Sequence, residues 1–105
     1  MFVERQTLLC KRGRYQELEA MLEQWSSEFM FPRAKAMRHY FSFIGPGGAE
    51  FCFELEFETL DDLQKGWEEW RGMAGEMTAY LEQFRDLIED GVRSELWRVK
   101  TTVSP

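Results

Sequence analysis

The chain has 105 residues, 44% hydrophobic and 30% charged, which is the composition and length of one globular domain, residues 1–105. Asp and Glu outnumber Lys and Arg by 19 to 13, so the net charge is −6. Nucleic acids and anionic membrane surfaces bind basic patches, and the acidic charge argues against both as partners. No apolar stretch approaches the roughly 20 residues that cross a bilayer, and residues 1–6 lack a signal-peptide pattern. The sequence therefore predicts a cytoplasmic protein.

The residues that bind metals most tightly are scarce. The chain has two cysteines, Cys10 and Cys52, and one histidine, His39, and it contains no CxxC motif. This is too few for a zinc site of Cys and His ligands, so we expect no metal and no other cofactor. In a reducing cytoplasm both thiols are expected to be free.

Alternating and helical spacings divide the chain into strands and helices. Strands are expected at residues 2–10, 37–44, 51–57 and 92–100. Apolar residues recur every three or four positions over residues 14–29, which predicts a helix. A second helical region begins after an N-cap at Thr59 or Asp61, breaks near Gly72 and Gly75, and ends at residues 90–91.

The order strand, helix, strand, strand, helix, strand is the ferredoxin-like βαββαβ pattern. It predicts an α+β domain with an antiparallel four-stranded sheet and its helices on one face. A Gly-rich turn at residues 45–48 makes the two middle strands a hairpin, and its position gives an estimate of the register. That register pairs Phe43 with Phe51, Phe41 with Phe53 and His39 with Leu55 on the apolar side, and Tyr40 with Glu54 and Arg38 with Glu56 on the polar side.

Several short segments along nearly the whole chain are distinctive. They are Glu4, Lys11 with Gly13, Ile44-Gly45-Pro46, Phe57-Glu58-Thr59-Leu60, Trp67, Met77-Thr78-Ala79-Tyr80-Leu81 and Leu87-Ile88. Together they resemble the dimeric α/β-barrel superfamily, and within it the NIPSNAP-like and antibiotic biosynthesis monooxygenase-like proteins. The resemblance implies a homodimer in which the sheets of two subunits pack face to face. It also brings the ends of the first and third strands together, so a redox-sensitive Cys10–Cys52 pair is the alternative to free thiols.

The sequence departs from the family pattern at four polar positions. It has Gln6 and Leu8 where the family often has Arg and Tyr, and Phe53 and Leu55 where the family often has His and Trp. Those site residues are therefore not carried over to this chain.

The polar face of the sheet supplies the candidate catalytic residues. Glu54 and Glu56 are neighbours on one strand face, and two carboxylates in a cavity can act as an acid–base pair. The alternative is a solvated ladder of glutamates that pair with arginines such as Arg38. His39 is a candidate base or haem ligand, but the register favours a hydrogen-bonded histidine on the apolar side.

Four residues are candidates for ligand binding: Arg38, Tyr40, Glu4 and Trp97. The first strand offers either Glu4 and Gln6 or Arg5 and Thr7 to the polar face, and the sequence leaves this choice open. Trp25, Trp67 and Trp70 fall on helix faces, where they either form plain core or line an apolar ligand pocket.

These features predict a small homodimer that binds or transforms a small organic ligand in a sheet-lined cavity. One alternative is a non-enzymatic assembly module, and another is a monooxygenase-like enzyme that is cofactor-free or degrades haem. The first two hypotheses differ in whether the polar face encloses a cavity or fills itself with Arg–Glu pairs.

Overall fold

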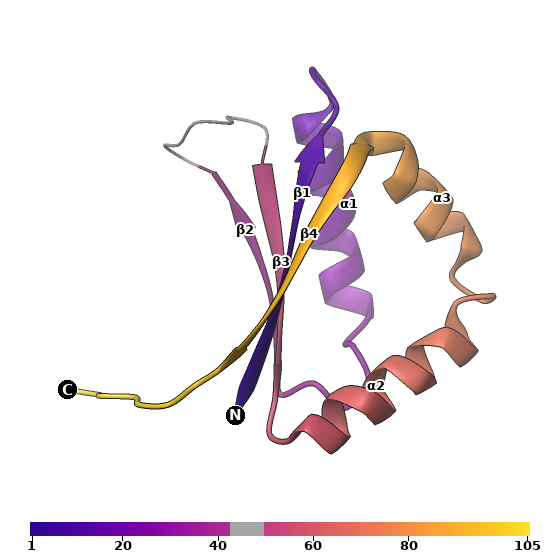
Figure 1. The fold of residues 1–105 in the computed structure, drawn as a ribbon. Helices are drawn as coiled ribbons and strands as arrows, with labels where there is room; N and C mark the ends of the chain where they lie inside the picture. The colour runs from indigo at the N-terminus through magenta and orange to yellow at the C-terminus, as the bar shows by residue number, and fades with distance from the viewer. Residues whose placement is uncertain (43–49) are drawn as a thin grey trace.

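The structure, a computed structural model, describes residues 1–42 and 50–105, with only the backbone of residues 90–92. The elements in chain order are β1 (Phe2–Cys10), α1 (Tyr15–Glu28), β2 (Ala36–Phe41), β3 (Glu50–Phe57), α2 (Leu60–Met73), α3 (Thr78–Leu87) and β4 (Ile88–Arg98). The strands form one antiparallel sheet in the order β2-β3-β1-β4. Figure 1 shows the three helices on one side of this sheet and the other side bare. The predicted α+β, ferredoxin-like architecture is confirmed.

Alternation along the strands assigns each side chain to one of two faces. The face under the helices carries Phe51, Phe53, Leu55 and Phe57 of β3, and the paired residues of β1 on this face are Leu8, Gln6, Glu4 and Phe2. We call the bare side the open face. Its residues include Val3, Arg5, Thr7, Arg38, Tyr40, Glu50, Cys52, Glu54, Glu56, Arg93, Glu95 and Trp97. The choice left open by the sequence is thus settled, because Arg5 and Thr7 lie on the open face and Glu4 and Gln6 lie under the helices.

The hairpin register differs from the prediction by two residues. Phe41 pairs with Phe51, and His39 pairs with Phe53. A shift of two leaves every side chain on its expected face, because the strand repeat is two residues. The shift stacks Phe41 on Phe51 with ring centroids 6.1 Å apart, a contact that the turn position alone could not indicate. The predicted turn and its flanking residues 43–49 lie outside the described residues.

The second helical region starts and breaks as predicted, but it ends earlier. Thr59 is the N-cap, and its side-chain oxygen accepts a hydrogen bond from the Asp62 amide at 3.1 Å, so the alternative cap at Asp61 is wrong. The predicted break separates α2 from α3. The predicted end at residues 90–91 is also wrong, because β4 begins at Ile88, directly after α3. Ile88 pairs with Cys10, so the backbone leaves the helix to join the sheet edge.

The core lies between the sheet and the helices in two clusters. One cluster joins Leu8 and Phe51 of the sheet to Leu18 and Leu22 of α1. The other surrounds Phe57, which is fully buried under α2. Gly66 of α2 comes so close to the segment after α1 that an added Cβ would lie 2.5 Å from the Pro32 carbonyl oxygen. The glycine therefore sets the distance between α2 and the rest of the domain.

Candidate functional site

A buried carboxylate lies at the centre of the open face. Glu54 of β3 is only 4% exposed. Its cross-strand neighbours are Arg5 of β1 and Arg38 of β2, which the register places directly opposite on either side. Arg5 Nε donates to Oε2 at 2.6 Å, and Arg38 Nη1 and the Tyr40 hydroxyl each donate to Oε1 at 3.2 Å. Both oxygens of this predicted catalytic residue are therefore occupied by donors from the same chain.

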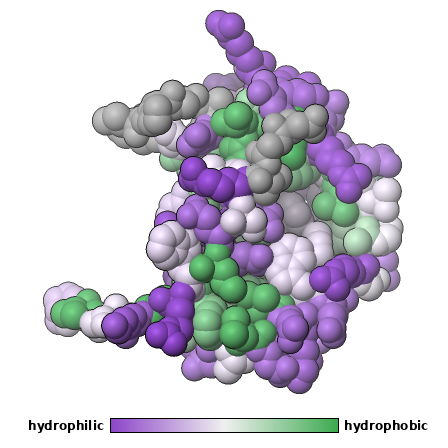
Figure 2. All heavy atoms as spheres, in the orientation of Figure 1, coloured by the Kyte–Doolittle hydropathy of each residue, from purple (hydrophilic) through white to green (hydrophobic). Residues whose placement is uncertain are grey.

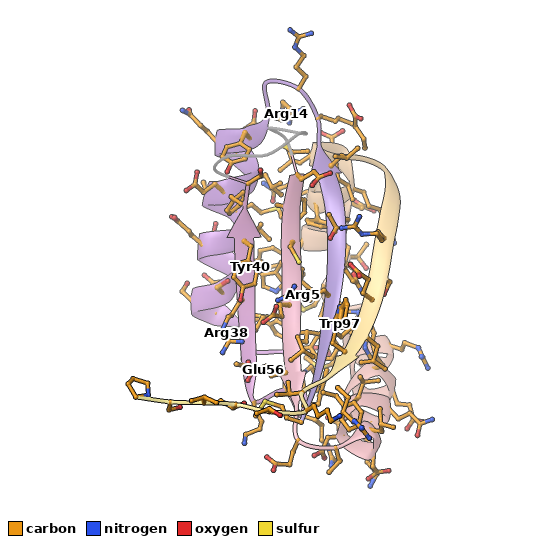
Figure 3. All side chains as sticks on the ribbon, turned by 60° about the vertical axis from the view of Figure 1, so that its left-hand side comes forward. Arg5, Arg14, Arg38, Tyr40, Glu56 and Trp97 are labelled. Atoms are coloured by element: carbon orange, nitrogen blue, oxygen red, sulfur yellow. The ribbon has the colours of Figure 1, made fainter. Side chains whose placement is uncertain are left out.

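Several other open-face charges are also paired. Arg38 donates to Glu56 as well as to Glu54, so the predicted Arg38–Glu56 pair forms, although along the diagonal of the sheet. Arg93 and Glu95 on β4 lie 3.3 Å apart. Figure 3 shows Arg5, Arg38, Tyr40, Glu56 and Trp97 on one surface of the sheet. Beside these pairs the same face has an open depression of about 250 Å³, lined among others by Arg5, Tyr40 and Cys52. The choice between the two arrangements considered from the sequence therefore stays a prediction.

The surroundings of Glu54 change the pKa values of Tyr40 and Arg5 on the open face. Burial raises the pKa of Tyr40, and the nearby Glu54 carboxylate raises it further. The hydrogen bond to Glu54 raises the pKa of Arg5, which stays a cation at any pH of interest. Tyr40 is thus a neutral donor at neutral pH, not a base.

The two thiols lie on opposite faces of the sheet. Cys10 is buried in the core under the helices, whereas Cys52 faces the open side between Thr7 and Tyr40. Both are free, as the predicted reducing environment requires, and the alternative of a Cys10–Cys52 pair is wrong. Burial raises the pKa of each thiol, so both are predominantly protonated at neutral pH.

The helix side of the sheet contains a cavity of about 320 Å³ with aromatic walls. We call it the aromatic cavity. Its aromatic lining residues are Trp25, Phe29, Phe31, Phe51, Phe53, Trp67, Trp70 and Phe84. The rings contact one another closely, as in the Phe31–Trp67 pair with centroids 4.9 Å apart. Figure 2 shows pale and green side chains in the space between sheet and helices, with purple polar side chains around it.

Two polar groups are available in these walls. Gln6 of β1 is the polar side chain that lines the cavity. The indole nitrogen of Trp25 is buried and has no acceptor within the described part of the chain. A buried N–H without a partner costs free energy, and a ligand acceptor would remove that cost.

Glu4 supports one wall of the cavity from behind. It lies under α2, half buried, and its Oε1 accepts a hydrogen bond from Trp67 Nε1 at 2.7 Å. Burial raises the pKa of this carboxyl, and the indole donor partly offsets the rise by stabilising the ionised form. The predicted ligand-binding residue Glu4 therefore lies on the opposite side of the sheet from the predicted Arg38, Tyr40 and Trp97.

His39 lies on the helix side at the edge strand, as the alternation predicts. Its Nδ1 is 3.2 Å from the Ser26 hydroxyl, and its ring lies against Phe53 with centroids 5.3 Å apart. It lines an open depression with Glu19 and Glu23, apart from the aromatic cavity. Burial lowers the pKa of His39, which keeps the imidazole neutral. The arrangement does not fit a haem ligand at the aromatic cavity.

Two further properties concern the residues that the structure describes. None of their helices has the length and apolar character needed to span a bilayer. None of their His, Cys, Asp and Glu side chains forms a group of three or more that could hold a metal ion.

Comparison with known proteins gives structural matches only. No family model and no curated protein matches the chain. A NIPSNAP family protein of unknown function from Agrobacterium tumefaciens is 26% identical, with a TM-score of 0.70 over 92% of this chain and 86% of that one. An uncharacterized NIPSNAP-like domain protein from Burkholderia xenovorans has a TM-score of 0.80 at 13% identity, covering 99% and 89% of the two chains.

A third match carries a different family name. It is a Bordetella bronchiseptica protein classed as an antibiotic biosynthesis monooxygenase, with a TM-score of 0.72, 13% identity, and coverage of 95% and 97%. The chain has the fold of the NIPSNAP and antibiotic biosynthesis monooxygenase-like proteins. The resemblance inferred from short segments is thus confirmed at the level of the fold.

The structure brings the predicted open-face residues onto one surface, and on the other side of the sheet it forms the aromatic cavity. The aromatic cavity joins Trp25, Trp67 and Trp70, for which both the core and the pocket interpretations were open, with Phe53 and Gln6 of the sheet. In the sequence, the number of aromatic residues on the helix faces was the feature that could have indicated this cavity. Spacing alone could not separate rings that fill a core from rings that enclose a space.

Proposed function

We propose that this protein binds a small, largely apolar organic molecule in the aromatic cavity, and that its open face packs against a second copy of the chain. The aromatic cavity is the observation that carries the first part. Its volume of about 320 Å³ falls at the lower end of the range for small-molecule sites. Such sites combine apolar walls with a few polar groups that orient the ligand, and Gln6 and Trp25 supply those groups here.

The open face supports the second part. Tyr40 and Trp97 are 44% and 55% exposed, although each is a large side chain on the bare face of a sheet. Aromatic residues and arginines with paired charges are typical of the surfaces through which proteins associate. We therefore assign the Glu54 cluster to assembly and hold the aromatic cavity as the place for any chemistry on a ligand. The free thiols fit a cytoplasmic location.

Ligand binding is tested with a neutral fluorescent probe, N-phenyl-1-naphthylamine, whose emission rises in apolar surroundings. We expect saturable binding by the protein and a loss of at least tenfold in affinity in Leu81→Phe, which adds a ring to the cavity wall. Leu60→Phe makes the same change on an exposed part of α2 and should leave binding unchanged. Equal binding by both variants, or no binding by the unmodified protein, would overturn the proposal.

The assembly is tested separately by sedimentation equilibrium. We expect a dimer that dissociates in Trp97→Asp, which puts a charge on the open face. A monomer at high micromolar concentration would refute the dimer but leave the aromatic cavity as a site within one chain. A dimer without probe binding would favour the non-enzymatic assembly module.

A further inference from the structure

In the part of the chain that the structure describes, a carboxylate lies behind the aromatic cavity with no cation to balance it. Glu4 is half buried, and among the described residues it forms a hydrogen bond to Trp67 but no ion pair. By contrast, the open-face carboxylates of Glu54 and Glu56 are each paired with an arginine. Removing a negative charge from water without a positive partner is unfavourable, so this side of the sheet would gain from a cation.

The hydrogen bond also changes the wall of the cavity itself. A carboxylate that accepts from an indole N–H pushes electron density toward the ring and makes the ring face more negative. Trp67 is that ring, and Phe31 and Trp70 extend the same wall, with the Phe31 ring stacked on Trp70 at 5.5 Å. Organic cations are held by the faces of such rings, most strongly by tryptophan.

The helices that cover the cavity add a field of the same sign. Together α1, α2 and α3 contain ten acidic and three basic side chains, a net charge of −7. The whole chain has a net charge of −6, so the excess negative charge belongs to the helical layer. A negative surface around a cleft raises the local concentration of cations and repels anions.

From these three observations we infer that the aromatic cavity selects an organic cation, a quaternary ammonium or a protonated amine, over a neutral molecule of the same shape. The inference rests on the proposed function, since it names the class of ligand for that site. Trp67 and Trp70 contact the cationic group, Glu4 acts through Trp67 as a positioning residue, and the walls from Phe51 and Phe53 hold the apolar remainder.

The test compares two molecules that differ in one atom. Benzyltrimethylammonium and neopentylbenzene have the same shape, with nitrogen replaced by carbon in the second. By calorimetry or tryptophan fluorescence, we expect the cation to bind about tenfold more tightly, the scale of a desolvated cation–π contact. The comparison needs only the unmodified protein, so it does not depend on any variant folding.

A charge variant then locates the selectivity. Glu4→Gln keeps an oxygen that accepts from Trp67 but removes the charge, and we expect it to weaken the cation several-fold while the neutral molecule changes less than about twofold. Glu82→Gln changes the net charge equally at an exposed site on α3. Because it removes only one of the ten helical acidic side chains, and water and salt screen it, it should change either affinity by less than about twofold.

The outcomes separate the two proposals. If the neutral molecule binds as tightly as the cation, or if Glu4→Gln weakens both equally, the cation inference is wrong and the aromatic cavity remains a ligand site. Uptake of the naphthylamine probe without binding of the cation would likewise overturn the cation inference alone. If neither the probe nor either small molecule binds, the proposed function fails and the inference fails with it.

Discussion

The Glu54 cluster allows a stability prediction in numbers. In Glu54→Ala, Arg5 and Arg38 lose a common anion and the Tyr40 hydroxyl loses its acceptor. A hydrogen bond to a charged group contributes about 1.5–3 kcal/mol when buried. Water can replace the carboxylate at the two arginines, whose side chains are 49% and 43% exposed. We therefore expect a net loss of about 2–3 kcal/mol in the free energy of unfolding, below the simple sum of three charged hydrogen bonds.

The assay is urea unfolding followed by tryptophan fluorescence at a fixed protomer concentration, since association would make the midpoint depend on concentration. In thermal unfolding, the same loss corresponds to a fall in Tm of about 10–20 °C for a domain of this size. Glu54→Gln keeps an acceptor oxygen and should lose about half as much free energy. Glu58→Gln, which removes the charge of an exposed carboxylate paired with Lys35, is the control and should show no measurable change.

A loss in Glu54→Ala that equals the control, within about 0.5 kcal/mol, would refute the reasoning. Such a result would mean that water already screens the charges of this cluster, and that burial of Glu54 does not contribute to the free energy of unfolding. If Glu54→Gln kept its stability but lost a measured turnover, the result would instead support the predicted catalytic role of this carboxylate.

Three further predictions concern the helix side. Gly66→Ala should lower the free energy of unfolding by about 1–3 kcal/mol, because its Cβ would collide with the Pro32 carbonyl oxygen. Gly72→Ala has open space around it and should raise the free energy of unfolding by about 0.5–1 kcal/mol. Thermal unfolding curves of the two variants that coincide would contradict this prediction. Because burial lowers the pKa of His39, the folded state binds fewer protons, so its contribution to stability falls as pH drops through about 6.5 and below. The test measures the free energy of unfolding at pH 7.5 and pH 5.5 for His39→Gln and for the unmodified protein. The variant should lose less stability between the two pH values, and an equal loss in both proteins would exclude His39 as the cause of the pH dependence. Trp67→Phe removes the indole donor from the half-buried Glu4 carboxylate and should lower the free energy of unfolding in urea by about 1–2 kcal/mol. An unchanged urea midpoint would contradict this prediction.

Patterns in neighbouring residues determined most of the fold. The alternation of Phe51, Phe53, Leu55 and Phe57 with Cys52, Glu54 and Glu56 established both a strand and its two faces, since a strand repeats every two residues. Thr59 predicted the start of α2 because its side chain caps amides only three residues away. The end of α3 was not predictable in this way, because pairing of Ile88 with Cys10, 78 positions earlier in the chain, overrides the local preference.

The candidate site depended on contacts between distant parts of the chain. Sequence alternation grouped Glu54 with Glu56, but only the sheet order placed Arg5 and Arg38 on either side of Glu54, where both donate to its carboxylate. Glu4 was a candidate from the sequence, yet its face was decided by the pairing of β1 with β3. Periodicity specifies which side chains share a face of one element, whereas a cavity exists only where faces of several elements meet without filling the space between them.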